Sequence, residues 1–266
     1  GSAASRYMLR ASRALLDLGH RVVRLNLRGA GPSRPDCRGQ YYAGGSADLA
    51  SVLALLPDRL AKDGLAKDGL VAVGYSVGGA ILLKYLGEAG QETPLAAAAS
   101  VSAPLDLAAT CRNLMRWRNW PSHCLLLRQM KHEALGPGAA LTPAERDGIR
   151  KARTLWQFDE LFTAPRNDFP DAATYYAHCS ASAFLGGIRI PTLVMAAQDD
   201  PWVPGAAYLG QHWGSYTSHS LLPLLPGQGG HVGFHGVGSP QPWSDLAVAK
   251  FLAWIGPPTP ASARSE

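Results

Sequence analysis

Ser76 lies in the sequence GYSVG (residues 74–78), with a glycine two positions away on each side. The preceding run, residues 70–75, is short and apolar, as buried strands are, and the run at 76–90 has helical spacing and ends in glycine. A serine with this glycine pattern, at a turn from strand to helix, is typical of a nucleophile held in a strained backbone conformation. We therefore predict that Ser76 is a catalytic nucleophile, with a purely structural turn as the alternative.

The neighbours of Ser76 are predicted to serve the same turn. We expect Gly74 and Gly78 to be glycine because side chains two positions from the serine would collide in so tight a turn. Val77 would open the following helix, so its backbone N–H is predicted to point towards a developing oxyanion.

A serine hydroxyl is a weak nucleophile, so this prediction requires a base and an acid that orients the base. Two segments that follow later strand candidates carry such residues, AAQDDPWVP at 196–204 and GQGGHVGFH at 227–235. Because parallel strands end at the same edge of a sheet, we expect both segments to lie beside Ser76.

Within these segments we favour Asp200 as the acid and His231 as the base. Asp200 precedes a proline in a D-P-x-V-P turn, whereas Asp199 is one residue nearer the strand and stays the alternative. His231 follows two glycines that allow a tight loop, so it is favoured over His235. The spacing of the two histidines would suit zinc only on a helix, which the glycines disfavour. No metal and no cofactor is predicted.

Strand-like and helix-like runs alternate along most of the chain. Strands are predicted at 21–27, 70–75, 95–103, 188–197 and 218–225, and helices at 4–18, 46–60, 76–90, 204–213 and 243–255. This alternation predicts an α/β fold, a mostly parallel sheet with helices on both faces.

The stretch from 107 to 187 interrupts the alternation and is predicted to be an inserted helical cap. The core of the fold would then comprise residues 1–106 and 188–256, followed by a disordered tail at 257–266. The cap is rich in aromatic residues, some of which we expect to line an apolar acyl pocket above Ser76. They include Trp117, Trp120, Trp156, Phe158 and Phe162.

The composition is that of an ordinary globular protein: of 266 residues, 47% are hydrophobic and 17% are charged. No apolar run reaches the roughly 18 residues that a membrane span needs, and the first ten residues contain no apolar signal core. The four cysteines are widely spaced and are predicted to be free thiols in a reducing compartment. We therefore expect a cytoplasmic protein.

The net charge of +5 is unevenly placed. The stretch from Leu107 to Lys131 contains no acidic residue and has two tryptophans, Trp117 and Trp120, among its basic ones. Its basic residues are Arg112, Arg116, Arg118, Arg128 and Lys131. This pattern fits a surface that contacts nucleic acid or anionic lipid, or a solvated helix face with the tryptophans turned inward. We favour the second interpretation, so no nucleic-acid partner is predicted. Replacing Arg112, Arg116 and Arg118 with Gln should change any weak contact with an anionic membrane surface little.

Several segments taken together resemble the YheT-like α/β-hydrolases, a family of esterases and lipid hydrolases. They are LNLRGAGPS, YYAGGSADL, VGYSVGGAILLKYLGE, VSAPLDLAA, FDELFTAP, PTLVMAAQDDPWVP and GGHVGF, and they span nearly the whole chain. The resemblance implies the α/β-hydrolase fold and a catalytic triad of Ser76, Asp200 and His231. It also implies hydrolysis of carboxylic esters, with short- or medium-chain acyl esters or phospholipids as substrates.

The chain is expected to depart from the family pattern at two internal positions and at its start. Tyr42 stands where relatives usually carry histidine, and Gly31-Pro32 replaces a Gly-Gly pair. Relatives also begin with further strands and an HG-type loop, which this chain is expected to lack.

These observations predict a serine hydrolase that cleaves carboxylic esters through an acyl-enzyme and has a small-molecule or lipid ester as its substrate. An acyltransferase that uses the same acyl-enzyme, and an inactive hydrolase-like chain that acts as a binding module, are the alternatives. The oligomeric state is not predicted.

Overall fold

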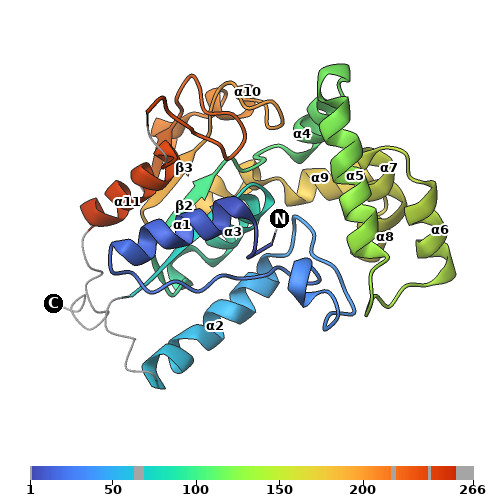
Figure 1. The fold of residues 1–266 in the computed structure, drawn as a ribbon, viewed down its shortest axis with the longest axis horizontal. Coiled ribbons are helices and arrows are strands. Elements are labelled where there is room, and N and C mark those ends of the chain that lie inside the picture. Colours follow the sequence, from blue (N-terminus) through green and yellow to red (C-terminus); the bar gives the residue numbers. More distant parts are fainter. Residues whose placement is uncertain (1, 63–68, 217–219, 239–240, 256–266) are drawn as a thin grey trace. The chain divides into compact units, whose positions relative to one another are not determined.

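The predicted alternation of strands and helices is present in the computed structural model, which describes residues 2–62, 69–216, 220–238 and 241–255 (Figure 1). The described residues cluster into two compact units. The sheet unit comprises Ala43–Leu105, Ser180–Asp200 and the described residues of Gly205–Glu266, and the helical unit comprises the described residues of Gly1–Tyr42 with Asp106–Cys179 and Pro201–Pro204. The division predicted from the sequence, with a cap at 107–187, stays a prediction, and the predicted tail lies outside the described residues.

The sheet unit is built on four parallel strands in the order β1-β2-β3-β4. The strands are β1 (Leu70–Tyr75), β2 (Leu95–Val101), β3 (Thr192–Met195) and β4 (Leu221–Leu224). All four confirm strands predicted from the sequence, although the last three are shorter than predicted. Parallel strands need crossover connections, and the helices between them supply these.

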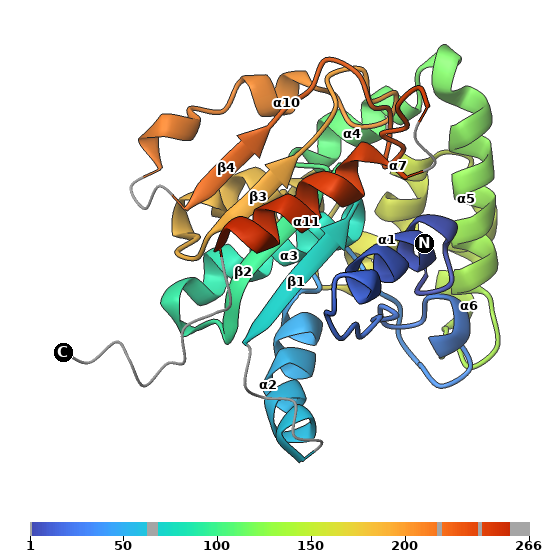
Figure 2. The ribbon, with the colours of Figure 1, turned by 60° about the vertical axis from the view of Figure 1, so that its left-hand side comes forward.

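The helices of the sheet unit are α2 (Ser46–Lys62), α3 (Val77–Ala89), α10 (Ala206–Leu209) and α11 (Trp243–Ile255), with the 3₁₀ turns η3 (Gly90–Glu92), η6 (Ala181–Gly187) and η7 (Trp213–Ser215). In Figure 2, α3 and α11 lie on opposite faces of the sheet. The predicted α/β fold with helices on both faces is therefore confirmed.

Strand β2 contains more alanine than strands usually do, and its central position explains why. Ala97, Ala98 and Ala99 are fully buried between β1 and β3. Buried parallel strands are covered on both faces, and small side chains let a helix approach the sheet closely. The approach is tight at Gly79 of α3, where an added Cβ would lie only 2.7 Å from Ser100 Oγ of β2.

Residues 21–27 do not form the predicted strand. They are irregular, and Val23 and Leu25 are exposed. A β-branched, alternating sequence becomes a strand only when a neighbouring strand completes its hydrogen bonds. No described strand pairs with this stretch, and β1 has β2 as its single partner in the described sheet.

The helical unit contains no strand among its described residues, as predicted for 107–187. Its longer helices are α1 (Arg6–Asp17), α4 (Leu107–Leu114), α5 (Trp120–Ala134), α6 (Pro143–Lys151) and α9 (Ala172–Cys179). Shorter elements are η1 (Gly31–Ser33), η4 (Trp117–Asn119), α7 (Leu155–Phe158), the π-helical turn η5 (Asp159–Thr163) and α8 (Ala164–Arg166). Helix α5 packs against α4, α6 and α7, and α9 packs against α4.

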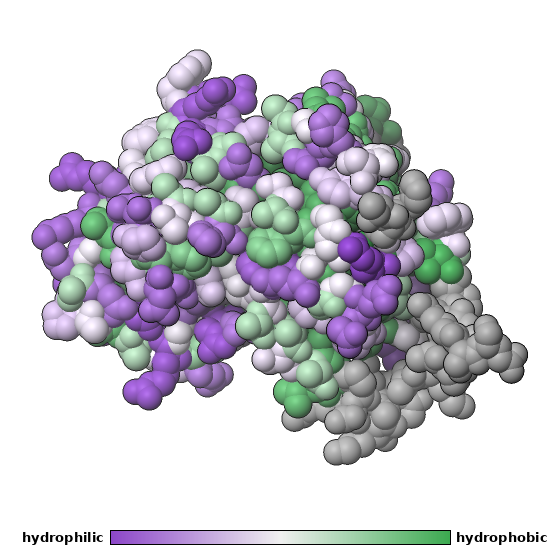
Figure 3. Space-filling model, turned by 180° about the vertical axis from the view of Figure 1, so that it is seen from behind, coloured by the Kyte–Doolittle hydropathy of each residue, from purple (hydrophilic) through white to green (hydrophobic). Residues whose placement is uncertain are grey.

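Hydrophobic and hydrophilic residues are intermixed over the molecular face drawn in Figure 3. No helix of the described residues is both long and apolar enough to cross a membrane.

Candidate active site

Ser76 lies between the last residue of β1 and the first residue of α3, in a backbone conformation that non-glycine residues rarely adopt. Its φ is 51° and its ψ is −128°. Such a conformation costs about 1–3 kcal/mol and persists only where surrounding contacts enforce it. Here the Ser76 N–H donates to Val101 O of β2 at 2.8 Å, and the Ser76 carbonyl accepts from Gly79 N and Ala80 N at 2.9 and 3.1 Å.

The glycines around Ser76 have different roles from those predicted. A Cβ at Gly74 would lie 2.7 Å from Gly78 O and 2.8 Å from Gly79 Cα, so glycine is required there as expected. A Cβ at Gly78 would meet nothing within 4 Å, so the prediction of a collision at Gly78 is wrong. The second tight position is Gly79, where a Cβ would crowd Ser100 Oγ, Gly74 O and Ala103 Cβ. The turn therefore requires glycine at Gly74 and Gly79, where the strand and the helix approach each other, and does not require it at Gly78.

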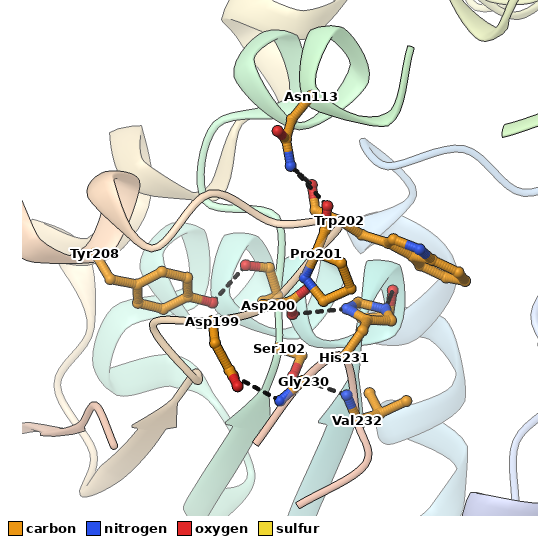
Figure 4. Close-up of polar contacts among 12 residues, drawn as sticks. Ser102, Asn113, Asp199, Asp200, Pro201, Trp202, Tyr208, Gly230, His231 and Val232 are labelled. Carbon is orange, nitrogen blue, oxygen red and sulfur yellow. Dashed lines mark hydrogen bonds and ion pairs between the residues drawn. The ribbon is translucent and has the colours of Figure 1, made fainter. Parts of the chain in front are cut away.

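A series of hydrogen bonds joins Ser76, His231 and Asp200, all in the sheet unit. His231 Nε2 lies 3.0 Å from Ser76 Oγ, and His231 Nδ1 lies 2.8 Å from Asp200 Oδ2 (Figure 4 draws the latter bond). The Asp200 side chain is fully buried and that of His231 nearly so. An ionised carboxylate only accepts, so Nδ1 carries the proton towards Asp200, and the lone pair of Nε2 is left to accept the serine proton.

The same geometry distinguishes the residues that the sequence left as alternatives. Asp200 bonds the imidazole, whereas Asp199 Oδ1 accepts a hydrogen bond from Gly230 N at 2.8 Å (Figure 4). His231 makes the bonds to both Asp200 and Ser76, and His235 is exposed. In the part of the chain that the structure describes, no group of three or more His, Cys, Asp and Glu residues could hold a metal ion.

The loop that carries His231 is itself strained and held at several points. Gly230, Val232 and Phe234 have φ of 62°, 50° and 48°. Besides the bond from Gly230 to Asp199, the Val232 N–H donates to Ser102 Oγ at 3.2 Å (Figure 4), and the Phe234 N–H donates to Gly229 O at 2.7 Å. Ser102 is fully buried, directly after β2, and has a φ of 53°. These contacts fix the position of the imidazole.

Sequence reasoning missed several residues that hold the site together. Ser102 is one, and Tyr208 is another: its hydroxyl donates to Ala103 O, and burial raises its pKa. Within the helical unit, Asn113 Nδ2 donates to both Pro201 O and Trp202 O at 2.9 Å, and Asn119 Nδ2 donates to Pro201 O at 2.6 Å. These amides fix the turn that follows Asp200. Neither asparagine stands in a motif, so no signal in one sequence identifies it.

Two further predictions concern single groups. Val77 is the first residue of α3, where a backbone N–H has no acceptor within its own helix, as the predicted oxyanion donor requires. Of the aromatic residues expected to line a pocket, Phe158 and Phe162 are buried against each other in the helical unit, with ring centroids 5.4 Å apart. These two side chains belong to the core of that unit.

The chain is similar in sequence to several known proteins. YheT of Escherichia coli is 34% identical over 190 residues, which cover 68% of this chain and 54% of YheT. Phospholipase ABHD3 of Mus musculus is 30% identical over 241 residues, covering 88% of this chain and 56% of ABHD3. The medium-chain fatty acid ethyl ester synthase/esterase 2 of Saccharomyces cerevisiae is 29% identical over 258 residues, covering 87% of this chain and 54% of that protein. The chain thus spans about half the length of the curated relatives that it matches.

A solved structure and a family model extend the comparison to the fold. The esterase Pf2001 of Pyrococcus furiosus superimposes with a TM-score of 0.62 at 18% identity, covering 96% of this chain and 78% of the esterase. The family model described as the alpha/beta hydrolase fold matches residues 1–236. The chain belongs to the α/β-hydrolase fold family.

Proposed function

We propose that this chain hydrolyses carboxylic esters through an acyl-enzyme formed on Ser76. The observation that carries the proposal is the continuous hydrogen bonding from Asp200 through His231 to Ser76 Oγ, at 2.8 and 3.0 Å. In this proposal Asp200 orients the imidazole and stabilises its protonated form, His231 is the general base and acid, and Ser76 is the nucleophile.

The reaction would proceed in two halves. Ser76 Oγ attacks the carbonyl carbon of the ester while its proton passes to His231 Nε2, and the carbonyl oxygen becomes an oxyanion that accepts from the Val77 N–H. The bond to the alcohol then breaks, His231 protonates the departing oxygen, and the acyl group stays on Ser76. Water attacks this acyl-enzyme with His231 as its base, and collapse releases the carboxylic acid and restores the serine hydroxyl.

The relatives support esters as the substrate class. One relative is named a phospholipase, and another a medium-chain fatty acid ethyl ester synthase and esterase. We therefore propose acyl esters of short or medium chain length, or lipid esters, as substrates. The name of the yeast relative also favours a second candidate, acyl transfer to an alcohol, because an alcohol can replace water in the second half of the same reaction.

Labelling with a fluorophosphonate probe, combined with turnover of p-nitrophenyl esters of graded acyl length, tests the proposal. The wild type should be labelled, and Ser76→Ala should lose the label and about 10⁴-fold or more in kcat. Ser51→Ala, at an exposed serine of α2, is the matched control and should leave both readouts unchanged. Label that persists on Ser76→Ala would refute Ser76 as the nucleophile. Adding ethanol to the assay separates the two candidates, since a transferase would yield the ethyl ester in place of the free acid.

A further inference from the structure

Trp117 of the helical unit is among the most exposed large hydrophobic residues of the described chain. Its side chain is 89% exposed, that of Trp120 is 45% exposed, and that of Leu125 is 59% exposed. The favoured sequence interpretation, in which the tryptophans turn inward, is therefore wrong for Trp117 and only partly right for Trp120. Exposing so large an apolar surface to water is unfavourable, so such a residue commonly marks a contact site.

Arginines lie close in the chain to Trp117 and to Leu125. Arg116 and Arg118 flank Trp117 in the chain, and Arg128 lies three residues after Leu125 on α5, the spacing at which helical side chains are neighbours. All three arginines are exposed, and none forms an ion pair with a carboxylate of the described residues. We call Arg116, Trp117, Arg118, Trp120, Leu125 and Arg128 the basic aromatic patch.

The backbone beneath the patch is anchored, so the exposure of Trp117 belongs to the folded state. Asn119, two residues after Trp117, is buried and donates to Asn113 O at 2.9 Å. The Trp120 ring stacks on His123 with centroids 4.5 Å apart, and His123 Nε2 accepts from Leu155 N at 3.1 Å. The next arginine towards the N-terminus, Arg112, is engaged differently, because its guanidinium lies over the Trp156 ring at 5.5 Å.

Because Trp117 is exposed, we propose, against the expectation from the sequence, that the basic aromatic patch docks on an anionic lipid surface. The arginines supply positive charge to the headgroup phosphates, and each basic residue near such a surface contributes about 1 kcal/mol at low salt, about fivefold in affinity. Trp117 and Leu125 supply apolar groups that enter the interface, where tryptophan is enriched in membrane proteins. A single-stranded nucleic acid would instead require several aromatic faces along a groove, whereas here one tryptophan protrudes among the arginines.

The test is co-sedimentation of the whole chain with vesicles of phosphatidylcholine alone and of phosphatidylcholine with phosphatidylglycerol. We expect binding to the anionic vesicles only, weakened about tenfold or more in the triple variant Arg116→Gln, Arg118→Gln, Arg128→Gln. The matched control is Arg6→Gln, Arg21→Gln, Arg146→Gln, which removes the same charge from exposed positions outside the patch and should keep most of the binding. Melting temperatures of all variants establish that they are folded.

Trp117→Ala tests the apolar part of the patch, with Trp254→Ala as its control because Trp254 of α11 is 70% exposed. We expect Trp117→Ala to weaken binding to anionic vesicles severalfold at both low and high salt, and Trp254→Ala to leave it unchanged. The proposal is overturned if the wild type ignores anionic vesicles, or if the control arginine variant loses as much binding as the patch variant. Binding to single-stranded DNA or RNA that depends on the same arginines, without vesicle binding, would also overturn it in favour of a nucleic-acid surface.

Discussion

Asp200 of the sheet unit and Asp159 of the helical unit are two carboxyl groups held by side chains of very different kinds. Asp200 accepts from His231, whose other ring nitrogen reaches Ser76. Asp159 accepts from the Tyr176 hydroxyl at 2.6 Å, and that hydroxyl also lies 3.3 Å from Cys111 Sγ. Burial raises the pKa of Asp159 to about 6, and the pKa of Tyr176 is also raised.

The difference between the two sites lies in what can compensate a buried charge. The imidazole beside Asp200 can become a cation and so stabilise the carboxylate when the reaction requires it. A phenol and a thiol stay neutral and offer Asp159 only hydrogen bonds, and the contacts from Asp159 through Tyr176 end at the thiol of Cys111, which is buried and whose pKa burial raises to about 12. Under the proposed function, the sheet unit holds the chemistry and the Asp159 cluster is structural.

Amide substitutions at the two positions test this comparison most strongly. Asp200→Asn should lower kcat by about 10⁴-fold, because the amide favours the wrong imidazole tautomer while leaving the geometry intact. Asp159→Asn keeps an oxygen that can accept from Tyr176 and should change kcat less than about threefold. Steady-state turnover of one p-nitrophenyl ester measures both. Comparable losses in the two variants would contradict the division of roles.

Gly78 and Gly79 of α3 provide a second comparison, between a backbone position with open space and one in close contact with the sheet. Gly79→Ala should destabilise the protein by about 2–3 kcal/mol, because the new Cβ would lie 2.7 Å from Ser100 Oγ and 3.1 Å from Gly74 O. Gly78→Ala, at a position with open space, should be neutral or stabilise by up to about 1 kcal/mol through helix propensity. Urea unfolding of both variants measures the difference, and equal effects would refute the tight approach at Gly79.

Gly78 and Gly79 also show which features of the structure could be predicted from one sequence and which could not. The strand-to-helix turn, the four sheet strands and the pairing of Ser76 with Asp200 and His231 all follow from local patterns, because period, glycine and chain order encode them. The collision at Gly79 depends on Ser100 and Ala103, which lie more than twenty residues away and carry no motif. The prediction of a strand at 21–27 was wrong because of a similar dependence on distant residues: a strand forms only when a partner elsewhere in the chain completes its hydrogen bonds.

The stability of the helical unit should depend on pH through Asp159. A carboxyl whose folded pKa is raised from 3.8 to about 6 contributes most stability at low pH, and that contribution is lost as the pH rises through 6. Asp159→Asn removes the penalty and should therefore raise the free energy of unfolding by about 3 kcal/mol at pH 8 and by about 1 kcal/mol at pH 4.5.

Asp171→Asn is a control in which the change in stability at pH 8 should have the opposite sign. The hydrogen bond from the Thr174 backbone N–H lowers its pKa, so Asp171 stabilises the fold above its unfolded pKa, and Asp171→Asn should lose stability at pH 8. Denaturant unfolding at pH 4.5 and pH 8 measures the change in the free energy of unfolding for both variants. A gain for Asp159→Asn that is the same at pH 4.5 and pH 8 would show that its carboxyl is ionised as easily as in the unfolded chain.

The smallest effects are expected from the residues that position the His231 loop without touching the reacting atoms. Ser102→Ala removes the acceptor of the Val232 N–H, so the imidazole should lose part of its alignment, and we expect about a tenfold lower kcat with KM unchanged. Asp199→Asn keeps an oxygen that can accept from Gly230 N, so its loss should be smaller still, about threefold or less. A positioning role has a second signature: fluorophosphonate labelling should go to completion in both variants but more slowly in Ser102→Ala, in the same ratio as kcat. If Asp199→Asn instead loses as much activity as Asp200→Asn, the acid of the site has been assigned to the wrong aspartate.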